Sequence, residues 1–157
     1  MEKLHGLILA AGKSSRLGQP KQLLPWYDTT LLSRQINLLK SVLVEVSCVL
    51  GAFYQDIERE CVISGAKVIR NPNWEKGQGG SIATGVCSLE EDIDAVLILL
   101  VDQWALNNDD IEHLINQWRL NTDKIVVSAI NNSSQLSPPV IFPRQYFDQL
   151  MALSGEA

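Results

Sequence analysis

A loop near the N-terminus carries the residue types that hold phosphate groups. Its sequence from Leu9 to Lys21 is LAAGKSSRLGQPK, where small residues let a ligand approach the backbone and successive N–H groups can bind phosphate oxygens. Lys13, Arg16 and Lys21 place three cations within nine residues of a chain whose formal net charge is −5. The spacing is neither GxGxxG nor GxxxxGKS/T, so the loop is neither a dinucleotide fingerprint nor a P-loop. Its composition favours an anionic ligand, with a solvated surface loop as the alternative.

Asp102 lies where a metal ligand would be expected. It directly follows the apolar segment 96–101, VLILLV, so the acid comes at the carboxyl end of a strand that the sequence predicts to be buried. Mg²⁺ in proteins is commonly held by one or two carboxylates together with substrate phosphates. We therefore predict that Asp102 binds Mg²⁺; a helix N-cap or a surface turn is the alternative role for this acid.

A second glycine-rich segment, GQGGS at 77–81, precedes a predicted helix. The free N–H groups of a helix N-terminus can bind an anion, so this segment is a second candidate for contact with the ligand. A flexible hairpin tip and a simple serine cap at Ser81 are the alternatives.

Composition limits the kinds of protein that the chain can be. It has 157 residues, of which 46% are hydrophobic, with 13 Lys+Arg against 18 Asp+Glu. That length predicts one domain with its own core, and the acidity argues against a general nucleic-acid binder. No segment reaches the roughly 20 apolar residues of a membrane span, and the N-terminus lacks a signal-peptide pattern. Cys48, Cys61 and Cys87 form no CxxC pair and are expected to be buried thiols, so we expect a soluble cytoplasmic protein.

The alternation of strand and helix patterns positions these segments. Apolar runs predict strands over 4–10, 44–50, 67–69, 95–100, 125–130 and 139–142. Helical spacing, caps and stops predict helices over 31–42, 54–63, 81–89 and 144–153, and another that begins after Asn107 or Asn108. This alternation predicts a mostly parallel sheet covered by helices on both faces, with ligands beyond the carboxyl ends of the strands. The loops 11–25 and 71–80 and Asp102 should then surround one crevice.

Histidine and tryptophan add little to the site. His5 and His113 have no partner at ligand spacing and are expected to be structural. The four tryptophans are expected in the core or at its rim: Trp26, Trp74, Trp104 and Trp118. Trp104, two residues after Asp102, is the one exception that could stack on a base.

These segments resemble a known family. The stretch from Leu9 to Lys21 is similar to the LAAGxSxRxGxxK signature of the MobA-like nucleotidyltransferases, and QLLPW at 22–26 is similar to their molybdenum cofactor cytidylyltransferase branch. The resemblance continues through Asn71-Pro72, GQGGS at 77–81, Asp102-Gln103 and PVIFP at 139–143. It implies a Rossmann-like three-layer α/β sandwich, with one nucleotidyltransferase domain over 1–157.

The resemblance also implies a reaction and a set of contacts. CMP would pass from CTP to the terminal phosphate of molybdenum cofactor, or molybdopterin, with Mg²⁺ as cofactor and release of pyrophosphate. Arg16 and Lys21 would neutralise phosphates, and Asp102 would hold the metal. The other residues expected to bind nucleotide are Leu9, Ala10, Ala11, Gly12, Lys13, Asn71, Gly79 and Ser81. The spelling LAAG, where the guanylyl-transferring branch usually has LAGG, favours CTP over GTP.

Departures from the family pattern keep other functions open. Val101 and Trp104 flank the expected metal aspartate where the family usually has Gly and Pro. Residues 131–134, NNSS, are polar where the family often places Gly and Arg, and Ser137 stands where it usually has a glycine. The sequence is also expected to lack the C-terminal segment of its relatives. One alternative is a non-catalytic nucleotide- or cofactor-binding accessory protein that assists a molybdoenzyme partner. Another is a nucleotidyltransferase that uses GTP or acts on a sugar or alcohol phosphate.

Overall fold

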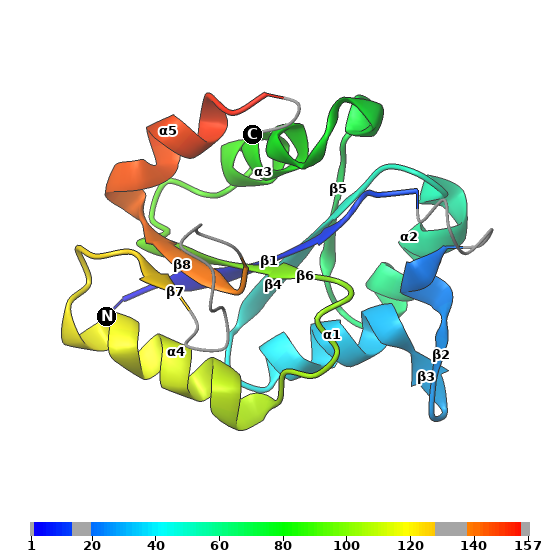
Figure 1. The fold of residues 1–157 in the computed structure, drawn as a ribbon, viewed down its shortest axis with the longest axis horizontal. Coiled ribbons are helices and arrows are strands. Elements are labelled where there is room, and N and C mark those ends of the chain that lie inside the picture. Colours follow the sequence, from blue (N-terminus) through cyan, green and yellow to red (C-terminus); the bar gives the residue numbers. More distant parts are fainter. Residues whose placement is uncertain (1, 14–19, 128–137, 155–157) are drawn as a thin grey trace.

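The computed structural model describes residues 2–13, 20–127 and 138–154. These residues form a six-stranded sheet in the order β5-β4-β1-β6-β8-β7 (Figure 1). The strands are β1 (Leu4–Ala10), β4 (Glu45–Leu50), β5 (Lys67–Arg70), β6 (Ala95–Leu100), β7 (Val126–Val127) and β8 (Val140–Pro143). Strands β5, β4, β1 and β6 are parallel, and β8 is antiparallel to both β6 and β7. The prediction of a mostly parallel sheet is confirmed.

Helices cover both faces of this sheet (Figure 1). On one face pack α1 (Leu31–Lys40), α2 (Tyr54–Ile63) and α4 (Asn108–Leu120), and on the other pack α3 (Gln78–Cys87) and α5 (Phe147–Met151). Strand β1 contributes to both cores, because Ile8 faces the first helix layer and Leu7 faces the second. The result is the three-layer α/β sandwich that the sequence predicts.

Short elements complete the chain between these helices and strands. In the described part of the chain, three of these are 3₁₀ turns: η1 (Lys21–Leu23), η2 (Trp74–Lys76) and η3 (Arg144–Tyr146). A small antiparallel hairpin, β2 (Pro25–Trp26) and β3 (Thr29–Thr30), leads into α1. No helix among the described residues has both the length and the apolar character to cross a membrane.

Side-chain caps begin two of the helices, α1 and α4. The Thr30 side chain accepts a hydrogen bond from the backbone N–H of Ser33 at 3.1 Å and begins α1. Asn107 and Asp110 form a reciprocal capping box at the start of α4. These side chains satisfy N–H groups that have no partner within the helix.

Several predicted boundaries differ from the structure, and three of the differences are larger than one or two residues or change the element. Helix α3 begins at Gln78 rather than Ser81, because Gly77 adopts φ 119° and turns the chain directly into the helix. The predicted helix 144–153 is divided into η3 and the five-residue α5. Of the predicted strand 125–130, β7 covers two residues and 128–130 lie outside the described part of the chain.

The expectation that all three cysteines are buried is wrong for one of them. Cys48 in β4 and Cys61 in α2 are buried in the same core. Cys87 is exposed, because it is the last residue of α3 and lies outside the core that this helix forms with the sheet.

His5 has the structural role that the sequence predicts. It lies in β1, is 5% exposed, and its Nε2 atom is 2.7 Å from the hydroxyl oxygen of buried Ser47 in β4. Burial lowers the pKa of His5, while Glu45 raises it and Lys67 lowers it by smaller amounts. His113, by contrast, is exposed on α4.

The lowered pKa of His5 predicts a loss of stability in weak acid. Below the pKa of an unfolded histidine, about 6.5, the unfolded chain binds a proton that the folded chain resists. The free energy of unfolding should therefore fall as pH decreases below that value, by at most about 1.4 kcal/mol per pH unit for one group. Urea unfolding between about pH 5 and pH 7.5 should show this slope in the wild type and a smaller one in His5→Gln. His113→Gln is the matched control, and an equal slope in all three proteins would contradict the prediction.

Candidate functional site

The candidate site begins where β1 ends. The backbone carbonyl of Ala11 accepts a hydrogen bond from the N–H of Ala52 at 3.0 Å. The Gln22 side chain, 1% exposed, donates from Nε2 to the carbonyls of Ala10 at 2.7 Å and Gly12 at 3.3 Å. These bonds hold three successive carbonyl groups of the loop against the body of the protein. Gln22 is therefore a framework residue of the site, which the sequence analysis did not single out.

The loop after β1 and the start of α3 enclose a pocket of about 260 Å³. It is lined by Leu9, Ala11, Gly12, Lys13, Trp74, Glu75, Gly77, Gln78 and Ser81. The predicted meeting of the first loop with the segment before α3 is therefore present in the structure. Ala10, Asn71 and Gly79 do not line this pocket, although the sequence analysis places them at the nucleotide.

Trp74 and Glu75 are pocket residues that the sequence analysis did not select. They lie in the predicted crevice loop 71–80, which was the only signal for them. Trp74 packs closely on Gly51, just after β4: a Cβ atom at Gly51 would lie 2.4 Å from the Cβ of Trp74. Glycine at this position therefore lets the indole form the wall of the pocket.

Two predicted nucleotide contacts bond to each other in the structure. Asn71 donates from Nδ2 to the hydroxyl oxygen of Ser81 at 2.9 Å, and its Oδ1 accepts from the N–H of Asn73 at 3.0 Å. Asn71 and Ser81 are each 3% exposed. The pair fastens the first turn of α3 to the loop after β5, so it positions one wall of the pocket.

Lys21, predicted to bind phosphate, and Asp102, predicted to bind metal, form an ion pair. The Lys21 ammonium in η1 lies 3.5 Å from a carboxylate oxygen of Asp102, which follows β6. Their side chains are 37% and 47% exposed, so the pair contributes little to stability and both groups remain accessible. Arg16, the other predicted phosphate contact, lies outside the described residues.

Asp102 fits the kind of site that Mg²⁺ takes with substrate phosphates. Among the described residues there is no group of three or more His, Cys, Asp or Glu side chains able to hold a metal ion by themselves. One exposed carboxylate next to an accessible cation instead matches a metal shared between protein and phosphates.

Gln103 fixes the turn that carries Asp102. Its Oε1 accepts from the N–H of Leu100 at 2.9 Å, and its Nε2 donates to the carbonyl of Pro138. Val101, which precedes Asp102, is 8% exposed and packs in the core, while its N–H bonds to the carbonyl of Leu9 at 3.3 Å. Valine is thus accommodated by core packing, and the turn forms without glycine.

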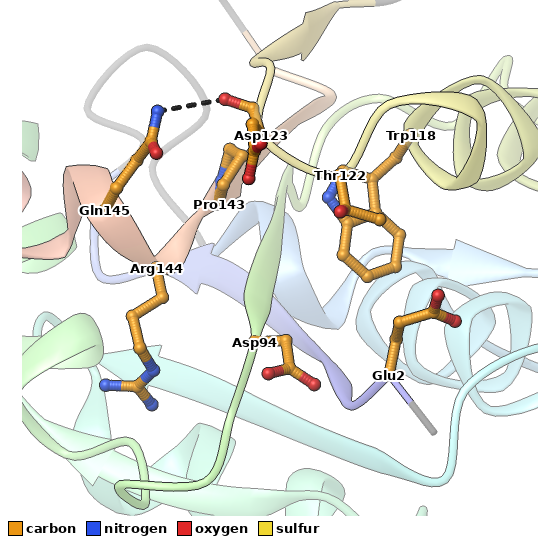
Figure 2. A pocket seen from close by; sticks show the side chains of 8 residues that line it. All are labelled: Glu2, Asp94, Trp118, Thr122, Asp123, Pro143, Arg144 and Gln145. Carbon is orange, nitrogen blue, oxygen red and sulfur yellow. Dashed lines mark hydrogen bonds between the residues drawn. The ribbon is translucent and has the colours of Figure 1, made fainter.

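Pockets larger than the one between the loop after β1 and α3 lie elsewhere on the described part of the protein. A pocket of about 520 Å³ is lined by Glu2, Asp94, Trp118, Thr122, Asp123, Pro143, Arg144 and Gln145 (Figure 2). It lies at the end of the sheet where β1 and β6 begin, away from Lys21 and Asp102. Arg144 donates there to the carbonyls of Ile93 and Glu90, so its guanidinium connects segments of the fold. None of the predicted site residues lines this pocket.

Removing the amide of Gln22 should loosen the loop. In Gln22→Leu, the carbonyls of Ala10 and Gly12 lose their donor while the side-chain volume is largely kept. We expect a fall of about 1–2 kcal/mol in the free energy of unfolding, measured by urea denaturation. Gln55→Leu, an exposed position on α2, is the control. Equal stability of Gln22→Leu and the wild type would mean that the two hydrogen bonds do not hold the loop.

The fold and the site together define an α/β protein with a candidate anion pocket at the carboxyl ends of parallel strands. The family is given by comparison with known sequences. The model of the MobA-like NTP transferase domain matches residues 6–157, and the chain belongs to this family.

Curated relatives carry two kinds of name. The purine catabolism protein PucB of Bacillus subtilis (strain 168) is 31% identical over 98% of this chain and 77% of its own length. A probable molybdenum cofactor guanylyltransferase of Bacillus cereus (strain Q1) is 31% identical over 62% of this chain and 48% of its own length. The part of this chain that matches these guanylyltransferases spans about half of their own length.

Solved structures share the fold. The crystal structure of Rv0371c from Mycobacterium tuberculosis H37Rv has a TM-score of 0.81 at 24% identity, covering 98% of this chain and 78% of that one. A cytidylyltransferase from Leptospira borgpetersenii has a TM-score of 0.73 at 20% identity, covering 95% of this chain and 63% of that one. At these identities the likeness establishes the architecture alone.

Proposed function

We propose that this protein is a Mg²⁺-dependent nucleotidyltransferase that transfers CMP from CTP to the terminal phosphate of molybdenum cofactor. The observation that carries the proposal is the approach of Lys21 to Asp102, 3.5 Å apart, at the same edge of the sheet as the pocket between the loop after β1 and α3. A cation and a metal-binding acid beside an anion pocket are the parts that phosphoryl chemistry needs. Membership of the MobA-like family supports the reaction class.

Each part of the site has a role in this reaction. The pocket formed by Ala11, Gly12 and the start of α3 would hold the nucleotide, with backbone N–H groups available to its oxygens. Lys21 and Arg16 would neutralise the phosphates. Asp102 would hold Mg²⁺, which when bound supplies further positive charge at the phosphate oxygens. An oxygen of the acceptor phosphate attacks the α-phosphorus in line, and the α–β bond breaks as pyrophosphate leaves.

Use of GTP is the second candidate function. It is favoured by the relatives that are named probable molybdenum cofactor guanylyltransferases, at 29–33% identity. The sequence LAAG at the end of β1 supports CTP instead. The two candidates share the same site and differ in the base that the pocket accepts.

Calorimetric titration of the protein with CTP and with GTP, each with and without Mg²⁺, tests the proposal. We expect Mg²⁺-dependent binding with a preference for CTP. A preference for GTP would assign the protein to guanylyl transfer. Absence of binding of either nucleotide would contradict the proposal and favour the accessory-protein alternative.

A further inference from the structure

Three aromatic side chains, two exposed and one half-buried, form a cluster on the two loops that carry Lys21 and Asp102. The ring of Trp26 in β2 lies 5.8 Å from that of Trp104, in the loop after β6, and 5.7 Å from that of Tyr27. Trp104 is 55% exposed and Tyr27 is 93% exposed. We call Trp26, Tyr27 and Trp104 the aromatic cluster. Burial of an aromatic ring is favourable, so neighbouring rings that stay exposed in the folded protein can still gain this energy by binding a ligand. Such rings therefore commonly mark a binding surface.

Neighbouring residues hold this cluster in place. The guanidinium of Arg34, in α1, lies over the ring of Trp26 at 5.5 Å from its centroid. Arg34 is itself anchored, because it donates to the Gln35 side chain at 2.7 Å and to the carbonyl of Leu106. Tyr27 sits at the hairpin turn with φ 55°, a conformation uncommon for a residue other than glycine. The exposed rings are therefore supported by a defined turn and an anchored cation.

The cluster lies on the same two loops as Lys21 and Asp102, the proposed reaction centre. Trp104 follows Asp102 by two residues, and Trp26 follows Lys21 by five. The cluster packs against α1, which covers one face of the sheet, whereas the nucleotide pocket is formed with α3, which covers the other. The Lys21–Asp102 pair joins the two loops from which the cluster extends. The cluster therefore extends from the same two loops as the pair, and none of its three residues lines the nucleotide pocket.

We infer that the aromatic cluster is the subsite for the acceptor, and that it stacks a planar nitrogen heterocycle whose phosphate reaches Lys21 and Asp102. This inference rests on the proposed function and names the part of the protein that would select the acceptor. Stacking on an aromatic face favours a planar π-system, so a sugar phosphate or alcohol phosphate would gain little from the same surface. Trp104 is then a residue that determines specificity.

Flavin mononucleotide is a suitable probe, because it joins a planar nitrogen heterocycle to a terminal phosphate. Its binding should be measured by calorimetry and by quenching of flavin fluorescence in four proteins: wild type, Trp104→Ala, Trp104→Phe and Leu120→Ala. We expect Trp104→Ala to raise the Kd about tenfold, corresponding to about 1.4 kcal/mol, and to reduce the quenching. Trp104→Phe should restore most of the affinity. Leu120→Ala, which truncates another exposed apolar side chain, should behave as the wild type.

Ribose 5-phosphate and CTP separate the possible outcomes. Ribose 5-phosphate should bind the four proteins equally, since it has no ring to stack. Flavin binding that is absent at millimolar concentrations, or equal in Trp104→Ala and the wild type, would overturn the inference. If Trp104→Ala weakened CTP as much as the flavin, the cluster would hold the nucleotide base and the inference would again fail. If the flavin depended on Trp104 while no protein bound CTP, the ring subsite would stand and the proposed function would fail.

Discussion

Replacing Lys21 with alanine is expected to lower the rate of nucleotidyl transfer by about 10²–10³-fold. The ammonium group lies 3.5 Å from a carboxylate oxygen of Asp102, the proposed metal ligand, where the triphosphate would bind. Its loss removes positive charge from the oxygens that become more negative as the α–β bond breaks. It should also raise the Kd for CTP roughly 10- to 100-fold, because one charge-assisted contact to phosphate is lost.

The same substitution should have little effect on folding. The side chain of Lys21 is 37% exposed and its ion pair with Asp102 is a surface pair, worth about 1 kcal/mol or less. A large loss of transfer with a nearly unchanged free energy of unfolding therefore identifies a functional role. Radiolabelled CMP transfer, CTP calorimetry and urea denaturation supply the three measurements. Lys124→Ala, at another exposed lysine, is the control, and unchanged CTP affinity in Lys21→Ala would remove Lys21 from the phosphate site.

Replacing Asp102 with asparagine should have the second large effect. The substitution keeps the shape of the side chain but removes the negative charge that would hold Mg²⁺. We expect CTP binding without metal to be nearly unchanged, the increase in affinity on adding Mg²⁺ to be lost, and turnover to fall by about 10²-fold or more. Calorimetric titration of CTP across a series of Mg²⁺ concentrations measures this directly.

A matched control separates metal binding from a general change of charge. Asp109→Asn removes a carboxylate from the first turn of α4, where the acid is exposed and lies outside the candidate site. This variant should respond to Mg²⁺ as the wild type does. If Asp102→Asn also responded fully, the metal would be held elsewhere and Asp102 would be no more than the partner of Lys21.

Several elements could be predicted closely because their signals are local. The strands at Leu4–Ala10 and Ala95–Leu100 and the helix at Tyr54–Ile63 have the predicted bounds. Each shows the periodicity of its element and is bounded by a turn, cap or stop residue close in sequence. The alternation of these elements also predicts which end of the sheet carries the site, because the carboxyl ends of parallel strands lie together.

Boundaries were less predictable where backbone conformation overrides composition. Two glycines at 79 and 80 argue against a helix, yet α3 includes both of them. The positive φ of Gly77 allows the helix to begin three residues earlier than predicted. Gly85 lets α3 pack closely on β1, because a Cβ atom at Gly85 would lie 2.7 Å from the side chain of Leu7. Packing of this kind is set by the neighbouring strand and leaves no pattern within the helix itself.

The sequence by itself determined the fold class and the position of an acid at the end of β6, since both follow from residues adjacent in the chain. Only the tertiary structure decided which polar groups are partners. Lys21 meets Asp102 across 81 positions, Gln22 binds back to Ala10 and Gly12, and Asn71 bonds to Ser81 rather than facing the pocket. The aromatic cluster likewise joins two loops that are remote in sequence. Local patterns specify the elements, whereas contacts between distant side chains depend on how the packed core orients those elements.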